Sequence, residues 1–573
     1  HSSYPLYSAV GSLFVTVLSW FGIAPATSTS LFSALFGALT IGLIVLLALE
    51  IGITGPSAAV GALAVAVSTS VWVDASLAEV HTVTLAFSVT TLLFAVRFGK
   101  GGARRDLLLL TLFFTQAVAH QRSVILLAPA VLILIWPHWR AIFRHVRAVL
   151  LITLLAPLTY LYLPLRAWMG ADWIFGDPAS WDGFWTLFFD NRADRIFEVQ
   201  SSLYVWVERA LRTWHLLTGD LAWPLLLLGF GALLGMMFDK DKKRYGAALT
   251  SVWLVNLLLA VLLWRGQVED AQLAATLPVL MMIGIGLAYL LDRLRGWSVW
   301  LGLAATVLLI LILGGWAWQA RDFTLSITRD RSVESIIKIV DRVEPFDDER
   351  ITTVTTPWGR DFWGLTYAQA YRGQLQGLNL VDHNANPREI MARGDHLLAP
   401  LATFYIYPLP WWEEFLGQSL YLSTAAPGVV EMSLAPPVAA AEIPLDTDFD
   451  LGNSIRIRSL RQEQLSEDQI QVTIYWQATD VVDQDYSVAV HLVAQDPPLG
   501  AADLLDQADN SHPVEGFYPT GRWQRGEIIR DDYLITIPEN SQAEAIRVGM
   551  YRFEEGEGFV NSEWLSLPVE KSP

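Results

Sequence analysis

Charged, histidine and aromatic side chains interrupt an otherwise apolar sequence at a few places in residues 1–320. Arginines can hold a phosphate through charge-assisted hydrogen bonds, and a carboxylate can take a proton from a hydroxyl group. Arginines and a carboxylate beside a long apolar surface could bind a lipid-linked phosphate and catalyse a reaction of it. The residues grouped in this way are Asp74, Glu79 and His81; His120 and Arg122; Tyr160, Tyr162, Arg166, Trp173, Gly176 and Asp177; and Arg265, Glu269 and Asp270.

Each of these residues also has an ordinary structural explanation. Arginines at the ends of membrane helices often extend toward the lipid headgroups, and an acid in an outer loop is usually only solvated. The sequence has no phosphate loop, no H-E-x-x-H and no G-x-S-x-G motif, and its histidines lack the spacing of metal ligands. It contains no cysteine, which excludes a thiolate nucleophile. We therefore expect chemistry from the combination of these groups, with neither a metal nor a cofactor.

Apolar stretches of about 15 to 21 residues, about ten in number, fill the chain between Leu31 and Trp318. Such a stretch can cross a membrane as a helix, and these lack the alternation of a membrane barrel. Of all residues 53% are hydrophobic and 17% are charged. The pattern predicts a polytopic α-helical membrane domain over residues 1–320. Gly284 and Gly286 lie inside one stretch and predict close helix packing rather than a nucleotide-binding loop.

The basic loops orient these spans. They cover residues 99–105, 138–147, 239–244 and 292–295, and they fall at alternate turns of the chain. The pattern predicts that these loops are cytoplasmic, and that the polar groups above and everything after Gln319 are extracytoplasmic. Hydroxyl residues at helical spacing in Leu6–Phe21 predict a juxtamembrane helix on the outer surface. The alternative is an ordinary span with a few tolerated hydroxyls.

The tail after residue 320 has a different character. Roughly 40 of the acidic residues lie there, which argues against nucleic acid as a partner. Residues 321–434 mix helical and strand patterns and predict a small extracytoplasmic α/β domain, followed by a linker at 435–444. Residues 445–573 predict a β-sandwich, with strands expected at 454–460, 469–476, 486–493, 528–537 and 545–552.

Several ordered motifs resemble a family of multipass proteins related to protein O-mannosyltransferases, with the GT-C membrane glycosyltransferase architecture. His1 to Tyr7 is similar to the family's H-P-P-G-Y-P-L-Y segment, and residues 78–82 (A-E-V-H-T) resemble its A-E-V-Y-T. Residues 160–167 (Y-L-Y-L-P-L-R-A) are the strongest match, continued by 173–178 (W-I-F-G-D-P), which looks like N-W-G-D-P. Asp270 and Pro278 fit a later D…L-P pattern. The resemblance covers roughly residues 1–320.

This resemblance implies a glycosyltransferase that moves a sugar from a polyprenyl-phosphate donor to a protein or glycan acceptor hydroxyl. The implied partners are the lipid-linked sugar, the acceptor, membrane lipids and other membrane subunits. Within the given sequence the candidate catalytic residue is Glu79, expected to orient the acceptor or the base, and the tail sandwich resembles carbohydrate-binding modules. Carried onto this sequence, the phosphate-binding residues are His120, Arg122, Arg166 and Arg265. The loop and acceptor residues are His1, Tyr4, His81, Tyr162, Trp173, Asp177 and Asp270, and the aromatic residues for sugar stacking are Trp476 and Trp523, with Tyr486 and Tyr518.

Two other functions stay open at this stage. The family's expected catalytic base lies upstream of its H-P-P segment, in a region that the given sequence does not contain, and Ser2-Ser3 and His81 depart from the family pattern. A catalytically inactive homologue that serves as a structural subunit would therefore look the same. A transporter is less favoured, because the polar residues gather near one leaflet rather than at the membrane midplane.

Overall fold

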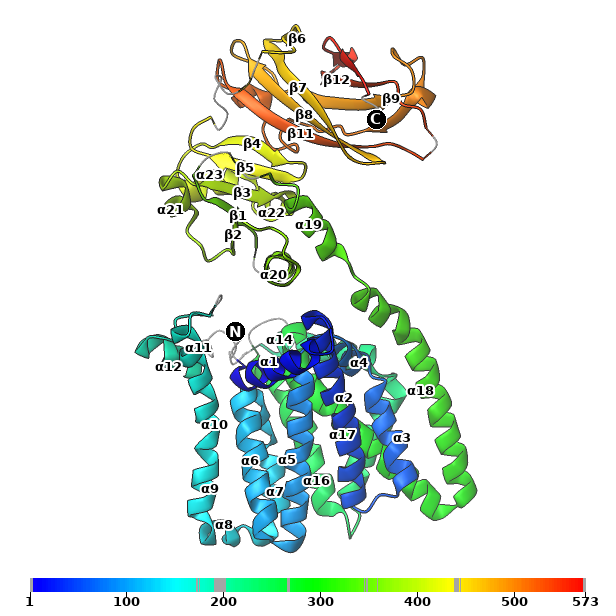
Figure 1. The fold of residues 1–573 in the computed structure, drawn as a ribbon. Coiled ribbons are helices and arrows are strands. Elements are labelled where there is room, and N and C mark those ends of the chain that lie inside the picture. Colours follow the sequence, from blue (N-terminus) through cyan, green and yellow to red (C-terminus); the bar gives the residue numbers. More distant parts are fainter. Residues whose placement is uncertain are drawn as a thin grey trace. The chain divides into compact units, whose positions relative to one another are not determined.

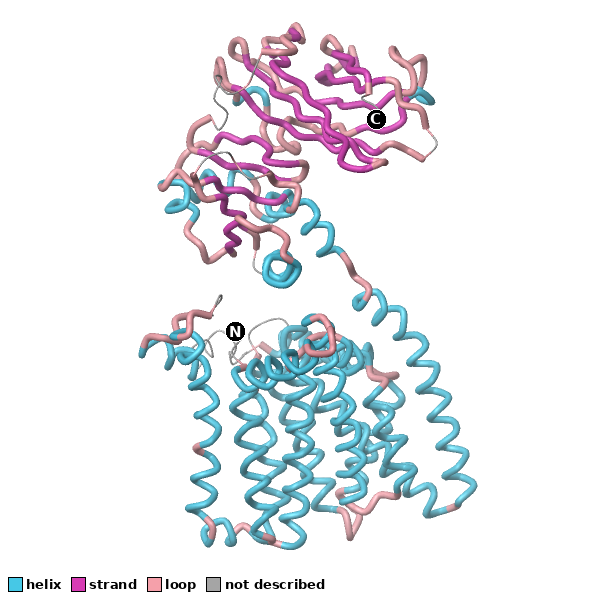
Figure 2. The backbone as a smooth tube through the Cα atoms, viewed as in Figure 1, coloured by secondary structure: helices cyan, strands magenta, loops and turns pink. Residues whose placement is uncertain are grey.

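A computed structural model gives the fold of the chain. It describes residues 4–171, 174, 176–189, 202–264, 268–344, 346, 349–357, 359–436, 443, 445–539 and 541–569, with only the backbone at 268–275. The chain divides into two compact units, His1–Arg329 and Asp330–Pro573. The first unit is helical, and the strands belong to the second unit (Figure 2).

The first unit is a bundle of helices that run roughly alongside one another (Figure 1). Its helices are α1 (Pro5–Ser19), α2 (Pro25–Glu50), α3 (Gly55–Ala66), α4 (Thr69–Ser76), α5 (His81–Gly101), α6 (Arg104–His120), α7 (Ala128–Ile135), α8 (Arg140–Arg144), α9 (Val146–Thr153), α10 (Leu155–Leu158), α11 (Tyr162–Trp168), α12 (Trp181–Phe189), α14 (Leu203–Asp220), α15 (Trp223–Met236), α16 (Lys243–Leu258), α17 (Val268–Trp297) and α18 (Val299–Thr328).

Fewer helices than the ten expected are long and apolar enough to cross a membrane in the part of the chain that the structure describes. Among the described residues, six helices are long and apolar enough to cross a membrane, or up to eight if each of two bent pairs is one span. The pairs are α3 with α4, bent by 72°, and α14 with α15, bent by 105°. At the other two predicted places the helices are short: α6 has 17 residues, and the apolar segment Arg122–His138 is broken into shorter pieces.

Helix α1 lies across the ends of its neighbours instead of running alongside them (Figure 1). It contacts α2, α6 and α11. With 15 residues it is shorter than the roughly 20 needed to cross a membrane. The hydroxyls of Thr16 and Ser19 donate to carbonyls of its own preceding turn, which satisfies them without a polar neighbour. The arrangement agrees with a helix at the end of the bundle.

Close helix packing occurs at the two glycines noted in α17. A Cβ atom at Gly284 would lie 2.4 Å from Val65 and 2.7 Å from the carbonyl oxygen of Gly61, both in α3. A Cβ atom at Gly286 would lie 2.3 Å from the carbonyl oxygen of Gly229 in α15. These distances allow no side chain. The two glycines let α17 touch two neighbouring helices backbone to backbone, as the sequence predicted.

The basic loops come together at one end of the bundle. The Lys100 ammonium contacts the Glu50 carboxylate, and Lys242 donates to the carbonyls of Ile51 and Gly52 at the adjacent helix end. Next to them the Tyr289 hydroxyl donates to Asp239. His81 begins α5 at the opposite end from Lys100, so the polar residues noted in the sequence lie away from the basic loops. That the basic end is cytoplasmic remains a prediction.

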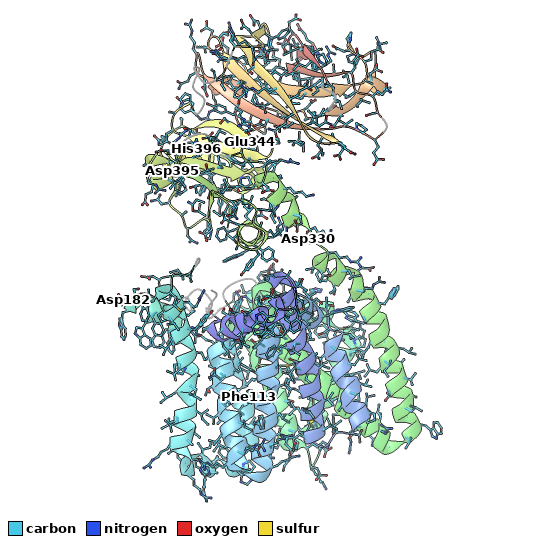
Figure 3. All side chains as sticks on the ribbon, in the orientation of Figure 1. Phe113, Asp182, Asp330, Glu344, Asp395 and His396 are labelled. Carbon is cyan, nitrogen blue, oxygen red and sulfur yellow. The ribbon has the colours of Figure 1, made fainter. Side chains whose placement is uncertain are left out.

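The second unit begins with a mixed α/β sheet in the order β2-β1-β3-β5-β4, in which β1 pairs parallel with β2 and β3, and β5 pairs antiparallel with β3 and β4. His396, at the start of β3, and Asp395 belong to this sheet region (Figure 3). Its elements are α19 (Ser332–Val340), β1 (Thr352–Thr355), α20 (Arg360–Tyr367), β2 (Leu378–Val381), α21 (Pro387–Ala392), β3 (His396–Pro400), α22 (Leu401–Ile406), α23 (Leu409–Leu416), β4 (Tyr421–Ala426) and β5 (Val429–Ser433).

Two antiparallel sheets follow, and they enclose a core that includes Ile457, Ile474 and Val490. One sheet has the order β11-β8-β7-β6, and the other β10-β9-β12-β13 with β14 also paired to β12. The five strands predicted from alternation are present, and most of the predicted linker lies outside the described residues. The strands are β6 (Phe449–Asp450), β7 (Ile455–Ser466), β8 (Gln469–Ala478), β9 (Ser487–Val493), β10 (Leu504–Gln507), β11 (Ile528–Thr536), β12 (Ala545–Glu554), β13 (Gly558–Asn561) and β14 (Leu565–Pro568).

A buried carboxyl lies inside this sandwich. Asp531, in β11, accepts hydrogen bonds from the indole N–H of Trp476 at 3.0 Å and from the hydroxyl of Tyr533 at 2.6 Å. Burial raises the pKa of Asp531 from 3.8 to about 7, although these hydrogen bonds lower it. The neutral acid is therefore favoured in the folded state.

We expect the second unit to lose stability as the pH rises from about 4 to about 7. A carboxyl whose folded-state pKa is raised contributes stability that is fully present below its unfolded pKa and is lost as the pH passes the folded pKa. A shift of about three pKa units corresponds to about 4 kcal/mol at most. Tryptophan fluorescence of the full chain, followed on heating at a series of pH values, would measure this change in stability. Asp531→Asn should flatten the dependence of stability on pH. Asp483→Asn, at an exposed position, should leave that dependence unchanged. Equal slopes of stability against pH in the two variants would contradict the assignment to Asp531.

Candidate functional site

A carboxylate is buried where α4 turns toward α5. Asp74 is 4% exposed, and its Oδ2 atom has no hydrogen-bond partner among the described residues. This atom lies 4.0 Å from Nδ1 of His81, the first residue of α5. Burying a carboxylate oxygen without a hydrogen bond is costly, which makes a functional role for Asp74 worth testing. The acid and the imidazole form a pair that could orient the ring and stabilise its protonated form.

Glu79 approaches the same imidazole from the more exposed side. Its Oε2 atom is 3.4 Å from Nδ1 of His81, and its side chain is 41% exposed against 13% for His81. The hydroxyl of Ser33, in α2, accepts from the Glu79 N–H and donates to the Glu79 carbonyl, both at 3.0 Å. The predicted residues Glu79 and His81 are thus brought together. His81 lies between the two acids, which makes it the centre of the group.

The turn after α6 joins this group from a second helix. His120 is 2% exposed, with Nε2 3.3 Å from the Val80 carbonyl and its ring 5.3 Å from the ring of Tyr4. The next residue, Gln121, accepts a hydrogen bond from Thr84 at 2.8 Å. His120 was predicted to contact phosphate. In this structure it is packed against the α4–α5 connection instead, because aromatic rings cover it.

Next in the chain, Arg122 lies on an apolar groove between α6 and the helices from α9 to α12. The groove has a volume of about 490 Å³, and Arg122 is the one charged residue among its described lining residues. Its guanidinium donates to the carbonyls of Leu187 and Phe188 at 3.0 and 2.7 Å. The groove is lined by Phe114, Thr115, Val118, Ala119, Arg122, Ile125, Thr153, Ala156, Pro157, Tyr160, Phe188 and Phe189.

The segment that carries the strongest motif continues from this groove. The Tyr160 hydroxyl donates to the Ala119 carbonyl, which ties the motif to α6. Tyr162 and Arg166 are half-buried on α11, a helix that contacts α1, and the Arg166 Nε atom has no hydrogen-bond partner among the described residues. The Asp177 side chain is exposed, while its carbonyl accepts from Ser180 at the start of α12. Asp177 shapes this turn through its backbone.

Four predicted residues cannot be placed in the site. His1, Trp173 and Arg265 lie outside the described residues, and Asp270 is described only as backbone in α17. Pro278, from the same motif as Asp270, lines a small cavity of about 10 Å³ together with His81, Gln121 and Asn256. That cavity has the size of one water molecule. Among the described residues, no three His, Asp or Glu side chains are placed to hold a metal ion.

The prediction that Trp476 and Trp523 stack on sugars is wrong. Trp476 is fully buried between the two sheets of the sandwich, and Trp523 is 4% exposed. Tyr518 is also buried and donates to Glu527. Tyr486 accepts a hydrogen bond from Arg552, whose guanidinium also lies over its ring. Alternation along a strand marks which residues share a face, and in a sandwich the large aromatic residues of that face fill the core.

Asp74 was grouped with Glu79 and His81 from the sequence, but it was given no role among the predicted site residues. It stands in an apolar run, V-W-V-D-A, where an ionisable residue is costly enough to indicate function. The sequence places Asp74 and His81 in one short loop, but it does not show that Asp74 is buried against the ring. Ser33, which fixes Glu79, comes from α2 and lies 46 residues away in the sequence.

The fold and this cluster define a multi-pass membrane protein with a polar site at one end of its helical bundle and a second unit of α/β and β-sandwich sheets. No family model and no curated protein matches the sequence. Among solved structures, the chain is similar to the crystal structure of ArnT from Cupriavidus metallidurans in the apo state. The match has a TM-score of 0.45 and 14% sequence identity, and it covers 74% of this chain and 86% of that chain.

Proposed function

We propose that this protein is a membrane glycosyltransferase that moves a sugar from a polyprenyl-phosphate carrier to an acceptor hydroxyl. One observation carries the proposal: an apolar groove, in which Arg122 is the one charged residue among the described lining residues, lies next to the pair of Asp74 and His81. The turn of His120, Gln121 and Arg122 joins the two, because Gln121 faces the cavity beside His81 and Arg122 faces the groove. Of these residues, His81 lies in the A-E-V-H-T segment that resembles the family motif, at a position where the family has a tyrosine.

The groove suits the prenyl chain of the donor. Aliphatic and aromatic side chains line it, so an isoprenoid chain would gain about 25 cal/mol for each Å² of apolar surface removed from water. Arg122 would bind the phosphate, exchanging the neutral carbonyls of Leu187 and Phe188 for charged oxygens. The Arg166 Nε atom, which has no hydrogen-bond partner among the described residues, offers a second donor on α11.

The acid–histidine pair suits activation of the acceptor. With Nδ1 of His81 facing Asp74 and Glu79, the tautomer protonated on Nδ1 is favoured and Nε2 is left as the base. Nε2 takes the proton of the acceptor hydroxyl as that oxygen bonds to the anomeric carbon of the sugar. The bond from the anomeric carbon to the phosphate oxygen breaks, and its electron pair leaves with the polyprenyl phosphate, whose charge the arginines stabilise.

We also place the reaction and the second unit on the extracytoplasmic side. The basic loops gather at the opposite end of the bundle from His81, and basic loops favour the cytoplasm. The indole N–H of Trp316, in α18, donates to the Asp220 carbonyl, whose side chain accepts from Ser70 at the start of α4. The chain therefore leaves the bundle at the end that holds the site.

Arg122→Ala should weaken binding of polyprenyl phosphate about tenfold to 100-fold and leave binding of the uncharged polyprenol unchanged. The reason is that a hydrogen bond to a charged group contributes about 1.5–3 kcal/mol. Native mass spectrometry of the full chain in nanodiscs, titrated with either lipid, measures both affinities. Arg321→Ala is the matched control, because Arg321 lies over the Trp318 ring on α18, away from the groove.

Filling the groove tests the lipid site independently. Ala119→Trp should reduce the affinity for both lipids, whereas Leu308→Trp, at an exposed position of α18, should change neither. Equal binding of phosphate and alcohol by the unmodified chain would contradict the proposal. Tight donor binding without any transfer would instead favour the alternative of a catalytically inactive subunit.

A further inference from the structure

The second unit contains a cleft where its α/β sheet meets the β-sandwich. The cleft has a volume of about 260 Å³. On one side it is lined by Arg342, just after α19, and by Pro427 in the turn between β4 and β5; the other side comes from the segment after β10 and from β11. The same two parts are joined nearby, where the Thr424 hydroxyl donates to Asp532. The cleft therefore belongs to one packed unit.

Polar side chains from both parts line this cleft. The Oε1 atom of Glu515 accepts the Gly428 N–H at 2.6 Å, across the boundary between the two parts. Asp509 lies 3.1 Å from Nε2 of His491, and Arg342 donates to the side chain of Gln469 at 3.3 Å. These contacts use only some of the hydrogen-bonding capacity of the Glu515 and Asp509 carboxylates and the Arg342 guanidinium. These side chains therefore offer both acceptors and donors to a ligand.

Glu515 is held in this position by an unusual backbone. Its φ angle is 57°, and that of Val514 is 56°, so two consecutive residues with side chains adopt the left-handed region. Such residues cost about 1–2 kcal/mol each, and the surrounding structure must impose them. Burial also raises the pKa of the Glu515 carboxyl, which favours a group that can donate as well as accept a hydrogen bond.

Apolar side chains from both parts also line the cleft, which is small. Ile339, Pro427 and Leu534 line it without polar side-chain atoms. Pockets for drug-sized ligands run from about 300 to 1,000 Å³, so this cleft suits a smaller molecule. Apolar side chains together with several hydrogen-bonding groups match a pyranose ring, which has C–H groups on its faces and hydroxyls around its edge. Three carboxylates line the cleft, those of Asp509, Glu515 and Asp532, and they disfavour a phosphate or another anion.

We propose that this cleft binds one sugar ring of a glycan acceptor, with its hydroxyls on Glu515, Asp509 and Arg342 and its C–H face on Ile339 and Leu534. The inference deepens the proposed function, on which it rests for the role of the glycan as acceptor. The cleft, rather than the buried Trp476 and Trp523, is then the proposed sugar-binding site of the second unit. The ligand class is a neutral saccharide with free vicinal hydroxyls.

Saturation-transfer difference NMR on the full chain in nanodiscs tests this assignment. The probes are the methyl glycosides of glucose, mannose, galactose and N-acetylglucosamine, with inorganic phosphate and spermidine as charged comparisons. Ala508→Trp fills the cleft, and Glu515→Gln keeps the shape of the side chain and its bond from Gly428. Glu555→Gln, in the exposed turn between β12 and β13, is the matched control.

At least one glycoside should bind the unmodified chain, and its signal should fall about tenfold in both cleft variants and stay unchanged in the control. Binding that persists in Ala508→Trp and Glu515→Gln, absence of binding by every glycoside, or binding of spermidine or phosphate alone would overturn the proposal. The proposed function is tested separately, by donor binding and transfer. If glycosides bind as expected while no sugar is transferred, the cleft is still a sugar-binding site. In that case only its role in binding the acceptor of the transfer reaction is contradicted.

Discussion

His81→Ala is expected to lower kcat for sugar transfer about 100-fold to 10,000-fold while binding of polyprenyl phosphate stays unchanged. A general base contributes a factor of this size, and His81 is the imidazole that lies between Asp74 and Glu79. Transfer of a radiolabelled sugar from the lipid donor to an acceptor, measured on the full chain in nanodiscs, gives kcat and KM. His145→Ala, between α8 and α9 at the basic end of the bundle, is the matched control.

Asp74 is a positioning residue in this scheme, because it acts through the imidazole. Asp74→Asn should therefore lower kcat with little change in KM, and Asp74→Glu should restore part of the rate. A merely structural role predicts a different result, namely loss of folded protein in both variants. If His81→Ala keeps full activity, the acid–histidine pair is not the base. If activity then depends on Glu79 alone, Glu79 is the general base, as its place among the candidate catalytic residues of the sequence suggested.

The sequence predicted the elements well where a periodic pattern decides the structure. The helix at 331–343 and the strands of the sandwich follow from apolar spacing alone, and α19, β7 and β8 lie where that spacing placed them. The count of spans was less accurate. Hydropathy records an apolar run but not its path, so the bends between α3 and α4 and between α14 and α15 were not predictable from composition.

The site was predictable only in part, for a related reason. Motifs identified Glu79, His81, Tyr4 and Arg122, and the structure does bring the first three together around His120. The sequence could not predict which of these side chains are buried. Asp74 and Glu79 look alike in a short loop, yet one is 4% exposed and the other has a side chain that is 41% exposed. Burial depends on contacts between distant segments, which a single sequence does not record.

The glycine contacts of α17 lead to the second large prediction, which concerns stability. Gly286→Leu should destabilise the bundle by about 3 kcal/mol or more, since overpacking commonly costs 1–3 kcal/mol and here the added atoms meet backbone. A Cβ atom at this position would lie 2.3 Å from the Gly229 carbonyl oxygen, and a carbonyl in a packed helix cannot move aside as a side chain can. Gly284→Leu should act in the same way against α3.

Gly314→Leu is the matched control for this experiment, because Gly314 lies in the apolar helix α18 and a Cβ atom there meets nothing within 4 Å. Both substitutions make the same change in composition and helix propensity, so a difference between them isolates the packing. The fraction of full-length protein that stays monodisperse after heating, followed by size exclusion in detergent, measures it. Equal midpoints for the two variants would mean that α17 is not held by backbone contact. The positions of His81 and Gln121 beside Pro278 of α17 would then need another support.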